Sequence, residues 1–102
     1  MKFSAHMEEW ELVQPFRISG FESSKAQCLV VELSDGGCSG RGEAQGVYYL
    51  DETSDSMFRQ VHEIAGQIRT GISRAALQHI LPPGGARNAV DCALWDLECK
   101  QA

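Results

Sequence analysis

Residues 86–102, ARNAVDCALWDLECKQA, contain the most regular pattern in the chain and decide its fold. Small and apolar side chains recur here every three to four positions, the spacing of one helix face. The members of that face are Ala86, Ala89, Val90, Ala93, Leu94 and Leu97, and it is widened by Trp95, Cys92 and Cys99. The pattern predicts a helix that runs to the last residue. Its apolar surface is wide for so small a domain, so we expect part of it to meet something outside these residues.

Two more helices are predicted upstream of this stretch. Pro82-Pro83-Gly84-Gly85 separates the last helix from a short one that starts at a Ser73 N-cap and ends near Ile80. Before it, an apolar face at helical spacing predicts a helix from an N-cap at Ser54 or Asp55 to a stop at Gly71. The members of this face are Phe58, Val61, Ala65 and Ile68.

The first half of the chain has the period of strands. Strands are predicted at 2–12, 26–34 and 38–44, with Asp35-Gly36-Gly37 as a hairpin turn between the last two. The alternation in the first strand slips at Glu8-Glu9, which suggests a bulge or a change of buried face. Pro15 is expected to close that strand, and residues 19–25 to form a polar loop.

Strands followed by helices define an α+β domain: a three-stranded antiparallel meander followed by three helices. The 102 residues suffice for one such domain, residues 1–102. The content of 43% hydrophobic and 23% charged residues is typical of a globular protein. No repeat divides the chain.

Charge and hydropathy exclude several kinds of partner. The net charge of −5 disfavours nucleic acid and anionic membranes, which both reward Lys and Arg. No apolar run approaches the ~20 residues that cross a bilayer, and the N-terminus lacks the apolar core of a signal peptide. We therefore expect a cytoplasmic protein that binds neither nucleic acid nor membrane.

Candidate chemical groups do not gather into a site. Four cysteines form no C-x-x-C pair, which favours buried free thiols. His6, His62 and His79 share no metal-ligand spacing, and the helical ones are expected on solvated faces. Gly40-Arg41-Gly42-Glu43 is neither a P-loop nor a dinucleotide motif and favours close backbone approach at each glycine. The residues by themselves predict no self-contained active site.

Three motifs nevertheless resemble the N-terminal capping domain of the enolase superfamily, in its muconate-lactonizing branch. They are Pro15-Phe16 with Ile18, leading to the V-V-E-L strand at 30–33; Gly40-Arg41-Gly42-Glu43-Ala44, followed by Glu52-Thr53; and the run from Leu77 to Lys100. The likeness is strongest to dipeptide epimerases of the L-Ala-D/L-Glu type and covers essentially the whole chain.

The resemblance implies a longer protein with a (β/α)₇β barrel after the last helix. In the family, barrel residues hold Mg²⁺, and two lysines remove and return the α-proton of a dipeptide substrate through an enediolate. This chain would then be a cap without catalytic or metal residues, inactive alone, with its own C-terminal barrel as partner. We also expect the isolated chain to self-associate through its last helix or by strand exchange.

The cap contributes two specificity loops in this family. By position they contain Ser19, Gly20, Phe21, Glu22, Ser23 and Ser24 in the first loop, and Val47, Tyr48, Tyr49 and Leu50 in the second. The related Ala-Glu epimerases carry an arginine in the first loop, which is missing here. An apolar or cationic substrate side chain would suit Glu22 and the aromatic residues better than a glutamate, although those aromatic residues could equally pack onto the domain.

Other functions remain open on the sequence. A muconate cycloisomerase, an o-succinylbenzoate synthase or an N-succinylamino acid racemase would carry similar cap motifs. A stand-alone, non-enzymatic domain is the alternative from a different class.

Overall fold

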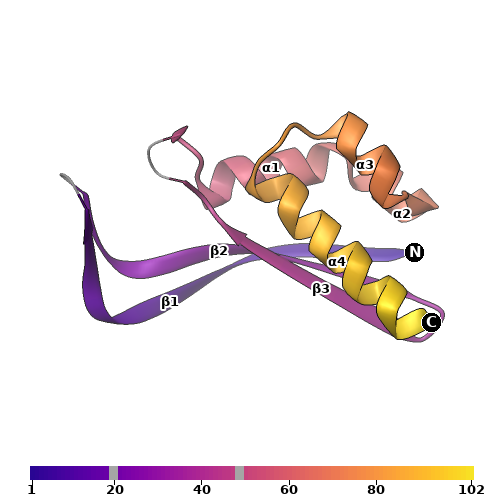
Figure 1. The fold of residues 1–102 in the computed structure, drawn as a ribbon, viewed down its shortest axis with the longest axis horizontal. Helices are drawn as coiled ribbons and strands as arrows, with labels where there is room; N and C mark the ends of the chain where they lie inside the picture. The colour runs from indigo at the N-terminus through magenta and orange to yellow at the C-terminus, as the bar shows by residue number, and fades with distance from the viewer. Residues whose placement is uncertain (19–20, 48–49) are drawn as a thin grey trace.

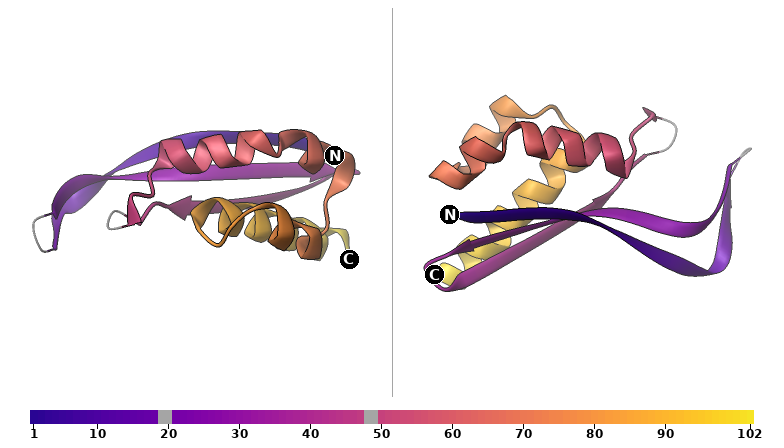
Figure 2. Two further views of the ribbon diagram at one scale, coloured as in Figure 1. Left: turned by 90° about the horizontal axis from the view of Figure 1, so that it is seen from above. Right: turned by 180° about the vertical axis from the view of Figure 1, so that it is seen from behind.

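The protein folds into a three-stranded sheet with helices on one face (Figure 1). The structure is a computed structural model that describes the backbone of residues 1–18, 21–47 and 50–102, and the side chains of residues 1–14, 25–47 and 50–102. The strands are β1 (Lys2–Ile18), β2 (Phe21–Asp35) and β3 (Cys38–Gln45), antiparallel and in the order β1-β2-β3. Figure 2 shows the helices stacked on one side of the strands. The α+β meander expected from the sequence is confirmed.

The turn between β2 and β3 follows directly from its glycines. Asp35 pairs with Cys38, which leaves Gly36 and Gly37 as a two-residue loop. Their φ angles of 58° and 85° are both positive, the conformation that tight hairpin turns require and that glycine adopts without strain.

The hairpin of β1 and β2 is longer than the sequence suggested. Pairing is regular through Glu8 and Glu9, so the predicted bulge there is wrong; the register shifts between Glu11 and Phe16 instead. Pro15, expected to close the strand, lies inside this irregularity and β1 continues to Ile18. A proline is tolerated at this point because β1 is an edge strand and a bulge needs no ladder bond. The paired hairpin extends far beyond the helices (Figure 1).

Four helices follow: α1 (Ser54–Glu63), α2 (Ala65–Gly71), α3 (Arg74–Ile80) and α4 (Gly85–Gln101). The single helix expected up to Gly71 is divided at Ile64, whose ψ of 11° lies outside the helical range. Thr53, and not Ser54 or Asp55, is the N-cap of α1, while Ser73 caps α3 as predicted.

The core lies between β2 and the helices. Leu29, Val31 and Leu33 alternate along β2 and are fully buried against Met57 of α1 and Val90 of α4. Burying each such side chain stabilises the fold by about 1.5–3 kcal/mol. The buried face of α4 is the one predicted from its spacing: Ala86, Ala89, Val90, Ala93, Leu94 and Leu97.

Candidate substrate-facing end of the domain

The two segments predicted to set specificity lie at the same end of the molecule. The described ends of the β1–β2 hairpin, and residues 46–47 with 50–52, lie at the end of the molecule that is remote from both termini (Figures 1 and 2). Ser19, Gly20, Tyr48 and Tyr49 lie outside the described residues. The fold therefore gathers what is described of the two segments at one end, as a substrate-facing surface requires.

The first predicted loop is largely strand. The backbone of Phe21, Glu22 and Ser23 pairs with Ile18, Arg17 and Phe16 of β1, and Ser24 continues in β2. The expected loop at 19–25 is therefore corrected: residues 21–25 belong to β2, and 19–20 lie outside the described residues. Polar residues along 22–25 suggested a loop, but strand pairing depends on backbone hydrogen bonds and not on side-chain polarity alone.

The second segment is held at its base by Glu52. The Glu52 carboxylate accepts hydrogen bonds from the backbone N–H of Val47 at 3.3 Å and of Gly85 at 2.9 Å. The Val47 carbonyl accepts from the N–H groups of Leu50 and Glu52, at 3.0 and 3.2 Å. Asp51 closes the turn with a left-handed φ of 55°. The described ends of the segment, Val47 and residues 50–52, are thus bonded to each other and to the start of α4.

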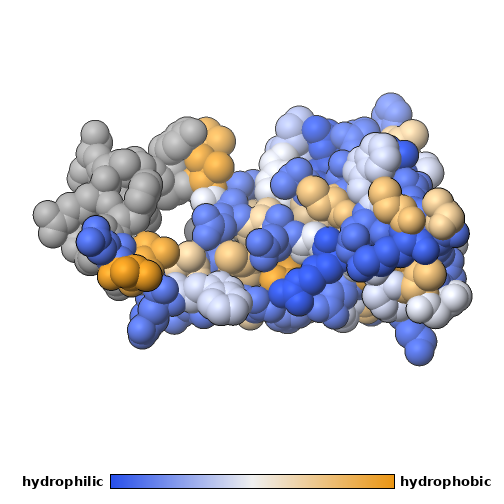
Figure 3. Space-filling view, turned by 60° about the horizontal axis from the view of Figure 1, so that its bottom comes forward, coloured by the Kyte–Doolittle hydropathy of each residue, from blue (hydrophilic) through white to orange (hydrophobic). Residues whose placement is uncertain are grey.

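Apolar side chains are exposed at this end. Leu50 is 69% exposed, Trp10 is 59% exposed, and Val13 is fully exposed on β1. The space-filling view shows apolar groups gathered at the hairpin end, whereas the face over the middle of the strands is mostly hydrophilic (Figure 3). Exposed large apolar groups beside the two segments form a surface suited to contact with a substrate or a neighbouring domain.

The G-R-G-E motif is a structural joint between β3 and α4. Gly40 and Gly42 face α4, and a Cβ atom at either position would overlap its backbone. Arg41 points to the opposite face, where its guanidinium bonds Glu8 at 3.0 Å and Glu32 at 3.3 Å. The Arg41 N–H, on the outer edge of the sheet, donates to Asp96 of α4 at 2.9 Å. The close backbone approach predicted from the glycines is confirmed.

Among the side chains that the structure describes, three carboxylates have a pKa below the ordinary value, each first because of a hydrogen bond. The bond from the Arg41 N–H, and then that from Lys100, lowers the pKa of Asp96. His6, 2.7 Å away, and then Arg41 lower the pKa of Glu8. Gln27 and then Lys25 lower the pKa of Glu9. All three carboxylates are thus held in the charged form, as structural ion pairs are.

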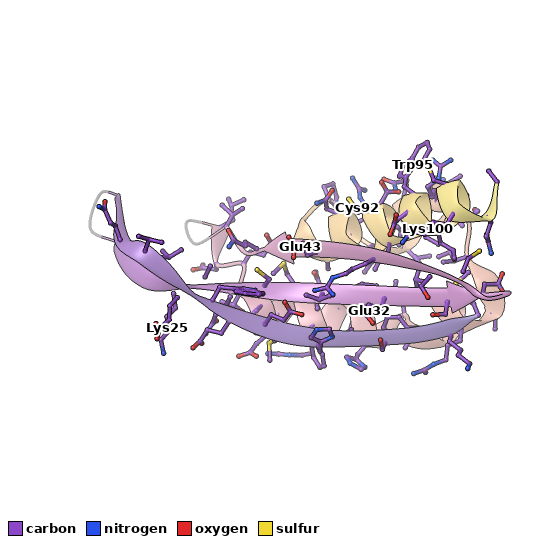
Figure 4. The ribbon with its side chains drawn as sticks, turned by 90° about the horizontal axis from the view of Figure 1, so that it is seen from below. Lys25, Glu32, Glu43, Cys92, Trp95 and Lys100 are labelled. Carbon is purple, nitrogen blue, oxygen red and sulfur yellow. The ribbon has the colours of Figure 1, made fainter. Side chains whose placement is uncertain are left out.

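The outer face of α4 carries side chains that the core does not use. Trp95 is 49% exposed, and the Arg74 guanidinium stacks 3.5 Å from its ring centroid while also bonding Glu98 at 2.7 Å. Cys92 and Trp95 project from α4 away from the strands (Figure 4). The prediction of buried thiols is right for Cys28 and wrong for Cys92 and Cys99, which are exposed.

A metal centre does not form within the described residues. Among residues 1–14, 25–47 and 50–102, no three His, Cys, Asp or Glu side chains gather closely enough to hold an ion. His62 and His79 lie exposed on helices, as expected. No described helix is long and apolar enough to cross a membrane.

Sequence reasoning missed the polar contacts that tie the segments to the helices. The motif Glu52-Thr53 contains Glu52, but no local pattern predicts its bond to Gly85. The sequence does contain one indication of such a contact. The N-cap Gly84 and the first helical residue Gly85 have no side chain that could cap α4, so the cap must come from elsewhere in the chain. Gln27 was also missed; it links Glu9 of β1 to the buried Ser54 at the start of α1.

Comparison with known proteins agrees with this architecture. Residues 2–102 match the family described as "Mandelate racemase / muconate lactonizing enzyme, N-terminal domain". The fold and its two converging segments therefore define an N-terminal domain of this class. The chain belongs to the mandelate racemase / muconate lactonizing enzyme family, within the enolase superfamily, and the predicted resemblance is confirmed.

Similar proteins include epimerases and a racemase. The L-Ala-D/L-Glu epimerase of Escherichia coli (strain K12) is 42% identical over 94 residues, 92% of this chain and 29% of the relative. The N-acetyl-D-glutamate racemase of a Pseudoalteromonas species is 32% identical over 76 residues, 72% of this chain and 24% of the relative.

A solved enolase-family structure from Agrobacterium tumefaciens, described as having homology to dipeptide epimerases, superposes with a TM-score of 0.92 at 33% identity. The match covers 97% of this chain and 30% of that one, whose structure contains bound sodium and L-Ala-L-Glu. The chain thus spans less than a third of the length of these relatives.

Proposed function

We propose that this chain is the substrate-capping and specificity domain of a dipeptide epimerase. The observation that carries the proposal is the 42% identity to an L-Ala-D/L-Glu epimerase over 92% of the chain. Gathering of the two specificity segments at one end of the fold supports it. The relatives are about three times longer, which supports a catalytic barrel beyond these residues.

Catalysis in this proposal takes place outside the chain. Epimerisation requires a base to remove the α-proton of the substrate and an acid to return a proton on the opposite face. In the family that the chain resembles, a Mg²⁺ ion held outside these residues would supply Lewis-acid stabilisation of the charge that develops on the substrate. The described residues do not fit a magnesium site, so we derive no step through the metal here. The role of this chain is to cover the bound dipeptide, exclude water and select its side chain.

We propose further that the substrate is not the Ala-Glu dipeptide. Residues 19–25 contain Glu22 and Lys25 but no arginine that could form a bidentate pair with a glutamate side chain. The sequence of the second segment also contains two aromatic residues, Tyr48 and Tyr49, followed by the exposed Leu50. Together these groups favour a dipeptide with an apolar or cationic second residue.

The test starts with the intact mass of the natively expressed protein. A mass about three times that of the 11.2 kDa chain supports the proposal, and a mass of 11.2 kDa overturns it. The longer protein is then assayed for α-proton exchange in D₂O with L-Ala-L-Glu, L-Ala-L-Leu and L-Ala-L-Lys. Preference for L-Ala-L-Glu would refute the specificity assignment, and a Glu22→Arg variant should shift preference towards it.

Two alternatives give different results in the same assay. A muconate cycloisomerase, an o-succinylbenzoate synthase or an N-succinylamino acid racemase would leave dipeptides unexchanged and act on its own substrate. Of these three, the racemase has some support from the Pseudoalteromonas relative, which is an N-acetyl-D-glutamate racemase. A stand-alone binding domain would exchange no substrate at all. Self-association of the isolated chain through α4, where Trp95 is exposed, is checked by light scattering; a strict monomer at high concentration argues against it.

A further inference from the structure

We propose that Glu52 is a positioning residue that fixes the second segment to the first turn of α4 and so sets its place over the substrate. The part of the inference that concerns substrate rests on the proposed function. The attachment of the second segment to α4 by Glu52 concerns the fold alone and does not depend on that function. Glu52 stands 33 residues before its partner Gly85, so the contact joins two distant parts of the chain.

The two carboxylate oxygens have separate tasks. Oε1 accepts from the Val47 N–H at 3.3 Å, within the segment, and Oε2 accepts from the Gly85 N–H at 2.9 Å, on α4. The backbone of Glu52 in turn donates to the Val47 carbonyl at 3.2 Å. Val47 and Glu52 are therefore locked to each other through both backbone and side chain, and the locked pair is bonded to the helix.

The residues around the carboxylate leave room for it. A Cβ atom on Gly84 would lie 2.8 Å from Glu52 Oε2, and one on Gly85 would lie 3.2 Å from Oε1 and overlap the Met57 sulfur. A Cβ atom on Gly46 would overlap the Glu52 carbonyl oxygen. Three glycines thus surround one partly buried glutamate. A side chain at residue 85 would meet Met57 and Glu52 together, and one at residue 46 would displace the Glu52 backbone.

The helix needs an anion at this point. The N-cap residue, Gly84, supplies no side-chain hydrogen bond, and the first turn of α4 contains no acidic residue. A carboxylate at a helix N-terminus is favoured by the unpaired N–H groups and by the helix dipole. Glu52 supplies the missing hydrogen-bond acceptor and the missing negative charge, although it lies outside α4 in the sequence. Its bond to α4 therefore stabilises the helix N-terminus as well as the turn.

Loss of the carboxylate should release the segment without unfolding the domain. Leu50 is 69% exposed and so adds no buried apolar contact to the turn, whereas α4 is held by six buried side chains. A released segment still covers the site for part of the time. The expected result is a raised KM for substrate with a smaller change in kcat.

The experiment compares Glu52→Gln and Glu52→Ala in the full-length protein, with Glu43→Gln as the matched control. Glu43 is an exposed carboxylate of β3 on the far face of the sheet. Backbone amide exchange at Val47 and Gly85 should rise by about 10- to 100-fold in Glu52→Ala and be unchanged in the control. Glu52→Gln keeps one acceptor oxygen and should protect one of the two amides.

Kinetics provide the second readout. KM should rise by about tenfold in Glu52→Ala and less in Glu52→Gln, while circular dichroism stays that of the unchanged protein. Unchanged exchange at both amides in Glu52→Ala overturns the attachment, whatever the activity. Raised exchange with unchanged KM overturns the role over the substrate. Absence of any dipeptide exchange in the unmodified protein overturns the proposed function and leaves the attachment to be judged by amide exchange.

Discussion

Gly42 of β3 lies against Ala89 of α4 so closely that a Cβ atom at residue 42 would overlap the Ala89 carbonyl oxygen. The same atom would lie 2.7 Å from the Ala93 nitrogen, so backbone, and not a flexible side chain, occupies the space. Gly40 repeats this contact one turn further along α4. The edge strand and the helix therefore touch backbone to backbone, which fixes the distance between β3 and α4.

Gly42→Ala should destabilise the domain by about 3 kcal/mol, because α4 must move away from β3 to admit the methyl group. The matched control is Gly66→Ala in α2, where a Cβ atom would meet nothing within 4 Å. That change should stabilise the domain by about 0.5–1 kcal/mol. Urea unfolding of both variants measures the difference; equal stabilities would contradict the close packing.

Much of this architecture could be predicted from short-range patterns. The turn at Gly36-Gly37 and the buried face of α4 follow from rules that act within a few residues. The length of the β1–β2 hairpin could not be predicted from such rules. Strand pairing around residues 22–25 depends on backbone hydrogen bonds between segments and not on side-chain polarity. Exposure of Cys92 and Cys99 also escaped prediction, since periodicity cannot tell which part of a wide apolar helix surface the rest of the fold covers.

The two candidate specificity segments were predicted only through a family resemblance, and their role stays a prediction. The bond between Glu52 and Gly85 could not be predicted, because it depends on how the chain returns to the same point after 33 residues. Contacts over such distances are set by the whole fold, so no local pattern reports them.

Thr53→Ala should lower stability by about 1 kcal/mol through loss of the α1 N-cap. The Thr53 hydroxyl accepts from the Ser56 N–H at 3.0 Å, and the Ser56 hydroxyl accepts from the Thr53 N–H at 3.0 Å. Thr53→Ser keeps the hydroxyl and should retain most of the stability. Chemical denaturation compares the two variants; an equal loss in both would mean that the methyl group, and not the cap, matters.

Acid should weaken the joint between Asp96 and Arg41. The folded-state pKa of Asp96 lies below its ordinary value of 3.8, first because of the Arg41 N–H and then because of Lys100. A lowered pKa contributes stability that is present above about pH 3.8 and is lost as the pH falls through the folded value. Unfolding midpoints measured from pH 7 down to about pH 2 should therefore fall less steeply in Asp96→Asn than in the unmodified chain. Lys100→Gln should retain most of the slope, because the backbone bond is the larger cause; a slope abolished by Lys100→Gln would contradict this order.

Thiol labelling should separate the four cysteines by burial. Cys92 and Cys99 are exposed on the outer face of α4. Cys38 is half-buried, with its thiol 3.6 Å from the Lys100 carbonyl oxygen. Cys28, in β2, is buried and only 7% exposed. Two thiols should react rapidly with an aromatic disulfide reagent, one more slowly, and Cys28 only on unfolding. The double variant Cys92→Ser/Cys99→Ser should lose the whole rapid phase, and peptide mass mapping assigns each site. Rapid labelling of Cys28 in native buffer would contradict the packing of β2.

The same labelling can be carried out on the longer protein. If the labelling rates of Cys92 and Cys99 both fall there, a further part of the chain covers the outer face of α4; unchanged rates would mean that this face stays open to solvent.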